Sequence, residues 1–310
     1  MSSSRAVSGR SAGWRCRAPT ERQRGGRPFS VVLASARRFG HNYHVSKPLR
    51  LATFLAPNML PVYAFIAGHI GRRLGLRTEL AVGTSSDQFA AGEVDVGFIC
   101  GLPYVQLARL NPPPVALLAA PVLTGERYAG RPVYFSDVVV RRGDAARGFG
   151  DLRGRSWAYN DLDSHSGYNL TRYELVRRGE IGGFFRRVVA AGSHQQALRM
   201  VARGVVDASA MDSQVLSVEL RDHPGLADDI EIVDTFGPST IQPLVAAAHL
   251  PEALITDVRA VVLSMHEDER ARDALMGGFI DRYVPVDDEQ YDDIRRMLGA
   301  AEAREFFTLA

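Results

Sequence analysis

The chain has 310 residues, of which 46% are hydrophobic and 23% are charged, a composition typical of a soluble globular protein with a sizeable core and room for two domains. Its two cysteines, Cys16 and Cys100, provide neither a disulfide framework nor the ligand spacing of a metal site. No apolar run reaches the roughly 18 residues that a membrane-spanning helix needs. We therefore expect no structural metal and no membrane span.

The formal net charge of +2 is unevenly distributed along the chain. Residues 1–47 hold nine Arg and one Lys against a single acid, Glu21, so 27 basic and 34 acidic residues remain from Pro48 onward. A basic surface is the usual footprint of a nucleic-acid-binding protein, so this acidic body argues against a nucleic-acid partner. Any anion site in the body has to work through local hydrogen-bond donors.

The Arg-, Ser- and Gly-rich segment 1–47 lacks hydrophobic periodicity, which predicts a disordered tail. Three other interpretations stay open: a secretion signal, a basic arm for nucleic acid or anionic lipid, and a true start near Val45. The only apolar patch, 29–36, is short, and polar residues follow Arg37-Arg38-Phe39 where a signal needs an apolar stretch. The tail therefore contains no convincing signal peptide.

From Pro48 onward, short apolar runs alternate with segments of helical periodicity, which predicts an α/β fold with a mostly parallel sheet. In the first half we expect strands at 49–55, 80–82, 94–100, 115–120 and 133–140, and helices at 60–74, within 84–91 and from Gly101 onward.

The same alternation continues in the second half of the chain. Here we expect strands at 155–159, 187–191, 205–210, 230–234 and 243–248, and helices at 166–178, 193–203, 213–222, 251–266, 269–283 and 289–303. The chain would cross between two lobes at 141–155 and at 235–242. These crossings predict lobe one at 48–142 plus 240–310 and lobe two at 143–239. Ligands of open α/β sheets bind beyond the carboxyl ends of the strands, so the lobes can share a cleft.

The segment Trp157–Tyr168 is the most informative local feature, because it is typical of a buried strand, a polar loop and the first turn of a helix. The first N–H groups of a helix lack intrahelical partners and the helix dipole makes that end partly positive, which suits an anion. Ser164 is also a good N-cap. The segment alone thus fits either an anion site or a capped helix that binds nothing.

Several motifs in order resemble the phosphate/phosphite/phosphonate-binding proteins of ABC transporters. The resemblance covers the chain from about Pro48 to the C-terminus. It implies a type 2 periplasmic-binding fold, in which two lobes are joined by two crossover segments and a hinge. The motifs are Gly92–Phe98 with Gly101 and Tyr104, Asp151–Arg155, Asn160–Gly167, Gly192–His194, Gly204–Ala208, Asp212-Ser213, Gly237–Val245, and Tyr283–Val286 with Tyr291.

The resemblance also implies a set of ligand-binding residues. The anion would sit on the helix that follows the polar loop, and other groups would read the rest of the ligand. Tyr104 fits a pocket wall or the core, and Asp212 fits a ligand contact or a simple N-cap. The implied residues are Ser164, His165, Ser166, Gly167, His194, Tyr104, Asp212, Ser213 and Gln242.

Two departures from the family pattern affect the expected ligand. His165 replaces the usual small hydroxyl residue, and Cys100–Tyr104 differs from the commoner Gly-Pro pattern. The ligand therefore need not be a phosphonate. As an imidazolium, His165 would make anion affinity rise as the pH falls through roughly 6.5.

The chain lacks a Gly-x-Ser-x-Gly elbow, a Walker loop and a His-Glu-x-x-His motif, so we expect neither an enzyme nor a cofactor. The resemblance implies a monomeric periplasmic solute-binding protein that captures a phosphonate-, phosphite- or phosphate-like oxyanion between its lobes and delivers it to an ABC permease. A cytoplasmic ligand-binding sensor on the same fold is the main alternative, which the lack of a convincing signal favours. An enzyme on this fold is the remaining one.

Overall fold

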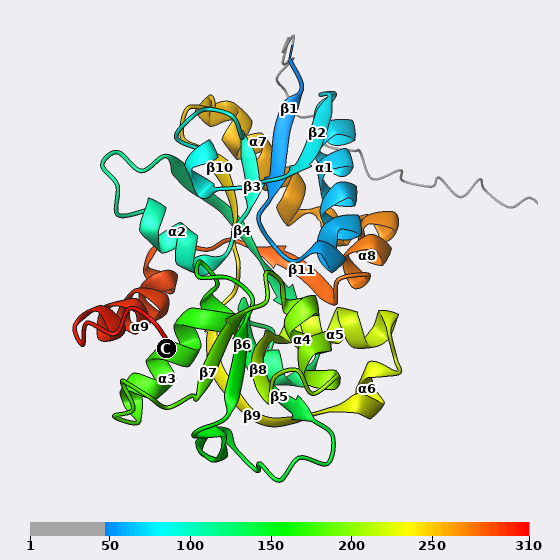
Figure 1. Cartoon of the computed structure of the whole chain (residues 1–310). Helices are drawn as coiled ribbons and strands as arrows, with labels where there is room; N and C mark the ends of the chain where they lie inside the picture. Colours follow the sequence, from blue (N-terminus) through cyan, green and yellow to red (C-terminus); the bar gives the residue numbers. More distant parts are fainter. Residues whose placement is uncertain (1–46, 310) are drawn as a thin grey trace, which may run out of the picture. The chain divides into compact units, whose positions relative to one another are not determined.

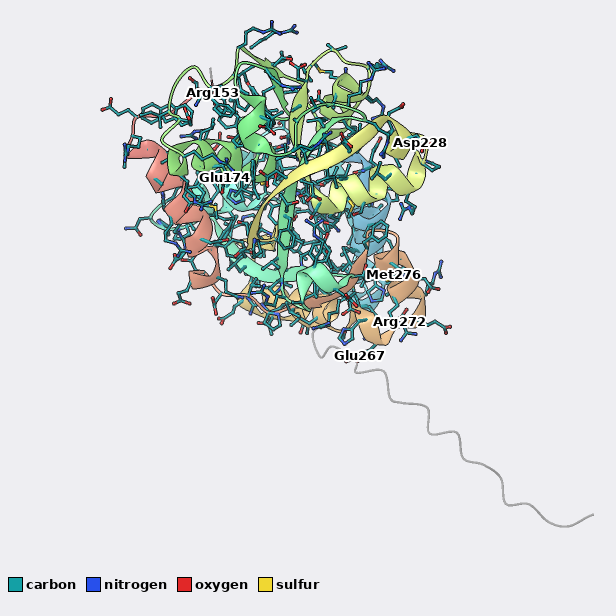
Figure 2. All side chains as sticks on the ribbon, turned by 90° about the horizontal axis from the view of Figure 1, so that it is seen from below. Arg153, Glu174, Asp228, Glu267, Arg272 and Met276 are labelled. Carbon is teal, nitrogen blue, oxygen red and sulfur yellow. The ribbon has the colours of Figure 1, made fainter. Side chains whose placement is uncertain are left out.

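The computed structural model describes residues 47–309, whose strands form two sheets (Figure 1). The expectations for the tail, Cys16 included, lie outside these residues. Within 47–309, no helix has the length and apolar character needed to cross a membrane. Figure 2 shows charged side chains such as Arg153, Glu267 and Arg272 at the periphery, where they contact solvent.

The first sheet has six strands in the order β11-β4-β10-β3-β1-β2 and helices on both faces. Strand β1 is parallel to β2 and β3, whereas β10 is antiparallel to β3 and β4, and β11 is antiparallel to β4. Helices α1, α7 and α8 bury apolar side chains on one face, and α2 and α9 do so on the other. The strands are β1 (Leu49–Thr53), β2 (Thr78–Val82), β3 (Val96–Phe98), β4 (Val115–Leu123), β10 (Leu244–Ala247) and β11 (Ile280–Val284), and the helices are α1 (Leu60–Leu74), α2 (Gly101–Leu107), α7 (Glu252–Leu263), α8 (Glu269–Met276) and α9 (Asp292–Glu302).

The second sheet has five strands in the order β7-β6-β8-β5-β9. Strand β6 is parallel to β7 and β8, and β5 is antiparallel to β8 and β9. Helix α3 packs on one face, and α4 and α5 pack on the other. The strands are β5 (Val133–Arg141), β6 (Ser156–Tyr159), β7 (Arg187–Ala190), β8 (Ala208–Asp212) and β9 (Ile230–Thr240), and the helices are α3 (Leu170–Arg177), α4 (His194–Ala202), α5 (Ser213–Asp222) and α6 (Leu226–Asp229).

The chain crosses between the sheets in two adjacent segments, from β4 to β5 through 124–132 and from β9 to β10 through 241–243. They are tied together, because Val133 pairs with Thr240 and the Ile241 N–H donates to the Pro132 carbonyl at 3.1 Å. Two crossovers that lie side by side have the geometry that a hinge between two halves of a molecule needs.

The second crossing, at 241–243, overlaps only the end of the expected one at 235–242, because β9 extends to Thr240, and the first crossing lies at 124–132 rather than at the expected 141–155. Strand β5, which the boundary at 142 assigns to lobe one, pairs with β8 and β9 in the second sheet. An apolar run indicates burial but not the sheet that buries it. The C-terminal Phe306 and Leu309, expected in lobe one, also pack in the apolar cluster of the second sheet. The lobe boundaries themselves stay a prediction.

Two further expectations need correction. The α/β class is confirmed, but the sheets are mixed rather than mostly parallel, because each crossover inserts antiparallel strands. The helix expected at 269–283 ends at Met276, and Ile280–Val284 forms strand β11. Gly277 and Gly278 end the helix, and Phe279 has a φ of 55°, which turns the chain into the strand.

Candidate functional site

A cleft of about 330 Å³ lies between segments that belong to the two sheets. The side of the first sheet contributes the turn after β1, the loop after β2 and the start of α2. The side of the second sheet contributes the loop after β6 and the starts of α4 and α5. The lining residues are Phe54–Pro57, Met59, Tyr63, Val82–Ser86, Ile99, Cys100, Pro103, Asn160, Asp161, Asp163, Ser164, Ser166, Gly192–His194, Asp212, Gln214, Val215 and Gln242.

The loop after β6 leads into one turn of π-helix, His165–Asn169, which continues as α3. Ser164 is the N-cap of this turn, and its Oγ accepts the Gly167 N–H at 3.0 Å. The hydroxyl oxygens of Ser164 and Ser166 lie 3.5 Å apart, and both residues line the cleft. The capping role and the cleft position of Ser164 therefore coexist.

His194, at the first position of α4, meets this loop. Its Nε2 lies 3.1 Å from Ser166 Oγ, and its Nδ1 has no hydrogen-bond partner among the described residues. Ser193 caps α4, because its Oγ accepts the Gln196 N–H at 3.1 Å. Burial lowers the pKa of His194 to about 4, so its ring is neutral at physiological pH. Two successive helix N-termini thus present hydroxyl and ring groups to one place.

Gly167 contributes to the site through its lack of a side chain and does not line the cleft. A Cβ built there would lie 1.9 Å from Asn160 Oδ1 and 3.2 Å from His194 Cε1. Glycine therefore lets the turn pack directly against Asn160 and His194.

The His165 side chain does not line the cleft and bonds to other parts of the protein. Its Nε2 lies 2.8 Å from Ser239 Oγ on β9, and Asn169 Nδ2 donates to its Nδ1 at 3.1 Å. The Ser239 hydroxyl donates to Asp293 Oδ2 at 2.9 Å, which leaves its oxygen to accept from His165. The proton of the neutral His165 ring therefore lies on Nε2.

The expectation that a charged His165 strengthens anion binding near pH 6.5 is wrong. The ring is fully buried, and this burial lowers its pKa to about 4. The backbone N–H of His165 donates to Cys100 Sγ at 3.3 Å, so His165 contacts the first-sheet side of the cleft through its main chain.

Asp212 lines the cleft and also caps α5. Its Oδ1 accepts the N–H groups of Gln214 at 2.8 Å and Val215 at 3.1 Å, and its Oδ2 accepts from Gln242 Nε2. Burial raises the pKa of Asp212 to about 6. Gln242 also lines the cleft.

Ser213 and Tyr104 do not line the cleft. Ser213 Oγ accepts the Phe135 N–H at 3.1 Å, and Tyr128 donates its hydroxyl to the same oxygen at 3.2 Å. Tyr104 donates to Asp288 Oδ1 at 2.6 Å and packs against the ring of Tyr291. Of the expected site residues, the structure brings together Ser164, Ser166, His194, Asp212 and Gln242.

Sequence reasoning missed the apolar wall of the cleft. Phe54–Pro57 follow β1 at its carboxyl end, and Tyr63 lies one turn into α1. The rule that ligands bind beyond strand carboxyl ends could have found the first group. Tyr63 has no comparable signal, because its spacing fits the buried face of an ordinary helix. Within residues 47–309, no cluster of His, Cys, Asp and Glu could hold a metal ion.

Comparisons with known proteins concern the fold and the family of the chain. The family model for the periplasmic phosphonate substrate-binding protein of ABC transporters matches residues 52–291. PhnD1 from Prochlorococcus marinus, in complex with methylphosphonate, has a TM-score of 0.72 at 18% identity, over 84% of this chain and 98% of that chain. A binding protein component of an ABC phosphonate transporter from Pseudomonas aeruginosa has a TM-score of 0.73 at 14% identity, over 85% and 90%.

The aliphatic sulphonate binding protein SsuA from Escherichia coli has a TM-score of 0.57 at 14% identity, over 84% of this chain and 88% of that chain. At such identities the solved structures show the fold alone, and that fold is the expected type 2 periplasmic-binding fold. The family model covers most of the chain, and its members bind substrates for transport rather than convert them. The chain therefore belongs to the phosphonate family of periplasmic substrate-binding proteins of ABC transporters.

Proposed function

We propose that this protein captures a small phosphonate-, phosphite- or phosphate-like oxyanion in the cleft, in the periplasm, and delivers it to an ABC permease. The observation that carries the proposal is the meeting of Ser164 and Ser166, at the N-terminus of the π-turn that leads into α3, with His194 at the N-terminus of α4. Helix N-termini are sites for anions because their free N–H groups and dipole favour negative charge.

Binding in this proposal uses neutral donors. A tetrahedral oxyanion accepts hydrogen bonds from the hydroxyls of Ser164 and Ser166 and from backbone N–H groups. In this proposal the Nε2–H of the neutral His194 ring donates to Ser166 Oγ at 3.1 Å, which orients the Ser166 hydroxyl and leaves its proton for the ligand. Donors that are already in place lose less conformational entropy on binding.

The two adjacent crossovers support a hinge between the sheets, and closure around the ligand would remove it from water. In this proposal the closed monomer docks on the permease. Asp212 and Gln242 line the cleft, where in this proposal they contact the part of the ligand that projects from its oxyanion.

Calorimetry with methylphosphonate, phosphite, phosphate and sulfate tests the proposal. We expect at least one of them to bind, and we expect Ser166→Ala to weaken that binding at least about tenfold, because a hydrogen bond to a charged ligand group contributes about 1.5–3 kcal/mol. Ser217→Ala is the matched control, because Ser217 Oγ donates to the Ser213 carbonyl at 2.7 Å inside α5 and does not line the cleft. No heat with any anion, or equal affinity in both variants, would contradict the proposal.

A further inference from the structure

The charge of the cleft is unusual for an anion site. Among residues 47–309, no Lys or Arg lines the cleft, whereas Asp161, Asp163 and Asp212 do. His194 adds no positive charge at neutral pH, because burial lowers its pKa to about 4. Charged side chains such as Arg153 and Arg272 lie instead at the periphery of the molecule (Figure 2).

The charged groups around Asp163 do not offset the negative charge of the cleft. Burial and the nearby carboxylates of Asp161 and Asp87 raise the pKa of Asp163 above its usual value, so carboxylates face one another at this end of the cleft. Asp87 belongs to the short turn after β2, on the side of the first sheet. Near His165, the charged neighbour is Asp293 of α9.

The charged groups around Asp212 do not offset the negative charge of the cleft either. The charge of Asp137 on β5 acts on Asp212, and Arg127 neutralises Asp137 in an ion pair at 2.8 Å. Arg199 of α4 is paired with Glu219 at 2.6 Å. The neighbouring hydroxyls of Tyr63 and Tyr134 stay protonated, because burial raises the pKa of each well above its usual value.

A second feature is the division of the cleft into a polar and an apolar part. The polar groups lie at the starts of the π-turn and α4, whereas Phe54, Leu55, Pro57, Met59 and Tyr63 form an apolar wall. A cleft of about 330 Å³ is in the range of sites for small organic molecules, which are mostly apolar with a few placed polar groups. A bare inorganic anion would leave the apolar wall in contact with water.

We propose that the cleft selects a singly charged tetrahedral oxyanion with an apolar substituent, which is a sulfonate or a phosphonate that keeps one proton, and rejects the dianion. This inference rests on the proposed function and names the charge and shape of its ligand. Neutral donors can satisfy one negative charge, but a second charge meets the carboxylates of Asp161, Asp163 and Asp212 without a cation to offset it.

Asp212 is the group through which this selection can be tested. Its pKa of about 6 leaves it ionised at neutral pH, buried in the wall of the cleft. Asp212→Asn removes the charge and keeps the cap, since Asn is as good an N-cap as Asp. Gln242 Oε1 has no partner among the described residues, so rotation of that amide can accept from the new Asn Nδ2.

Calorimetry with ethanesulfonate and ethylphosphonate, at about pH 7 and about pH 9, tests the inference. The two ligands share the tetrahedral head and the substituent, and only the phosphonate has a second proton to lose. We expect the affinity of ethylphosphonate to fall about tenfold at the higher pH, with uptake of about one proton on binding, which calorimetry in buffers of different ionisation enthalpy measures. Ethanesulfonate should change by less than about twofold.

In Asp212→Asn, the affinity for ethylphosphonate at about pH 9 should rise about tenfold relative to the affinity for ethanesulfonate. The reason is that the Asp212 carboxylate repels a dianion more strongly than a monoanion, so its removal favours the dianion more. Asp222→Asn, exposed at the other end of α5, is the control for the same change in net charge. Binding of ethylphosphonate without proton uptake, or failure of ethanesulfonate to bind where ethylphosphonate binds, overturns the inference alone. Absence of binding by both these and the inorganic anions overturns the proposed function with it.

Discussion

Ser166 and His194 form the central pair of the proposed site. Each lies in the first turn of a different helix, and they form a hydrogen bond at 3.1 Å inside the cleft. The pair depends on Gly167, since any larger residue would push the turn away from Asn160 and His194. The geometry of the site is thus fixed by one glycine as much as by the groups that would touch the ligand.

Gly167→Ala tests this dependence. The added Cβ would lie 1.9 Å from Asn160 Oδ1, so the turn or Asn160 has to move. We expect a loss of about 1–3 kcal/mol in the free energy of unfolding, measured by denaturant titration, together with weaker anion binding. Gly182→Ala is the control, because its φ is not positive and nothing lies within 4 Å of a Cβ there. Equal stability of the two variants would show that the turn tolerates a side chain.

The candidate site could be predicted from the sequence only in part, for reasons that lie in individual side chains. Ser164, Ser166 and His194 occupy the first turns of helices, which local sequence signals reveal. His165 stands between two of these residues, yet its ring bonds to Ser239, which is 74 residues away in the chain. Ser213 follows the cleft residue Asp212 but bonds to Tyr128 and Phe135. Side-chain direction depends on such distant partners, which no local pattern encodes.

At the scale of elements, helix α9 connects parts of the molecule that the sequence places far apart. Its Ile294 and Leu298 pack in an apolar cluster of the first sheet, whereas Phe306, just beyond its end, packs in the second. Asp293 accepts the Ser239 hydroxyl at 2.9 Å and the Thr240 N–H at 2.8 Å, both at the end of β9. The start of α9 therefore holds the strand that leads into the second crossover.

Asp293→Ala should destabilise the protein by about 1–3 kcal/mol, because it leaves buried donors of β9 without an acceptor. Asp292→Ala in the same turn should cost less than about 1 kcal/mol, since Asp292 pairs with Arg295 at the surface. Denaturant midpoints of the two variants measure the difference. Equal losses would contradict the anchoring role of Asp293.

Elements with local signals were predictable, and elements that depend on distant pairing were not. Helices α1 and α5 have the expected bounds, because apolar periodicity, Gly75 after α1 and Asp212 before α5 are all local. Strand β11 was expected as helix, since its strand conformation depends on pairing with β4. The same holds for the sheet membership of β5.

At the scale of the whole molecule, the family fold accounts for the position of the cleft. The two crossovers lie side by side, and in the proposed closure the halves around the two sheets rotate about this short segment while their cores stay intact. The cleft contains groups from both halves, with Thr84–Ser86 on one side and Ser164, Ser166 and His194 on the other. A ligand that contacts both sides favours the closed arrangement by its differential affinity.

The most direct measurement is a crystal structure of the protein with methylphosphonate. The account predicts the phosphonate oxygens within hydrogen-bond distance, about 2.5–3.2 Å, of the Ser164 and Ser166 hydroxyls and of at least one backbone N–H of the loop after β6, with His194 Nε2 still bonded to Ser166 Oγ. The methyl group should point toward the apolar wall at Phe54 and Tyr63. A phosphonate bound elsewhere, or a cleft that stays empty at a concentration that saturates binding in solution, would contradict the account.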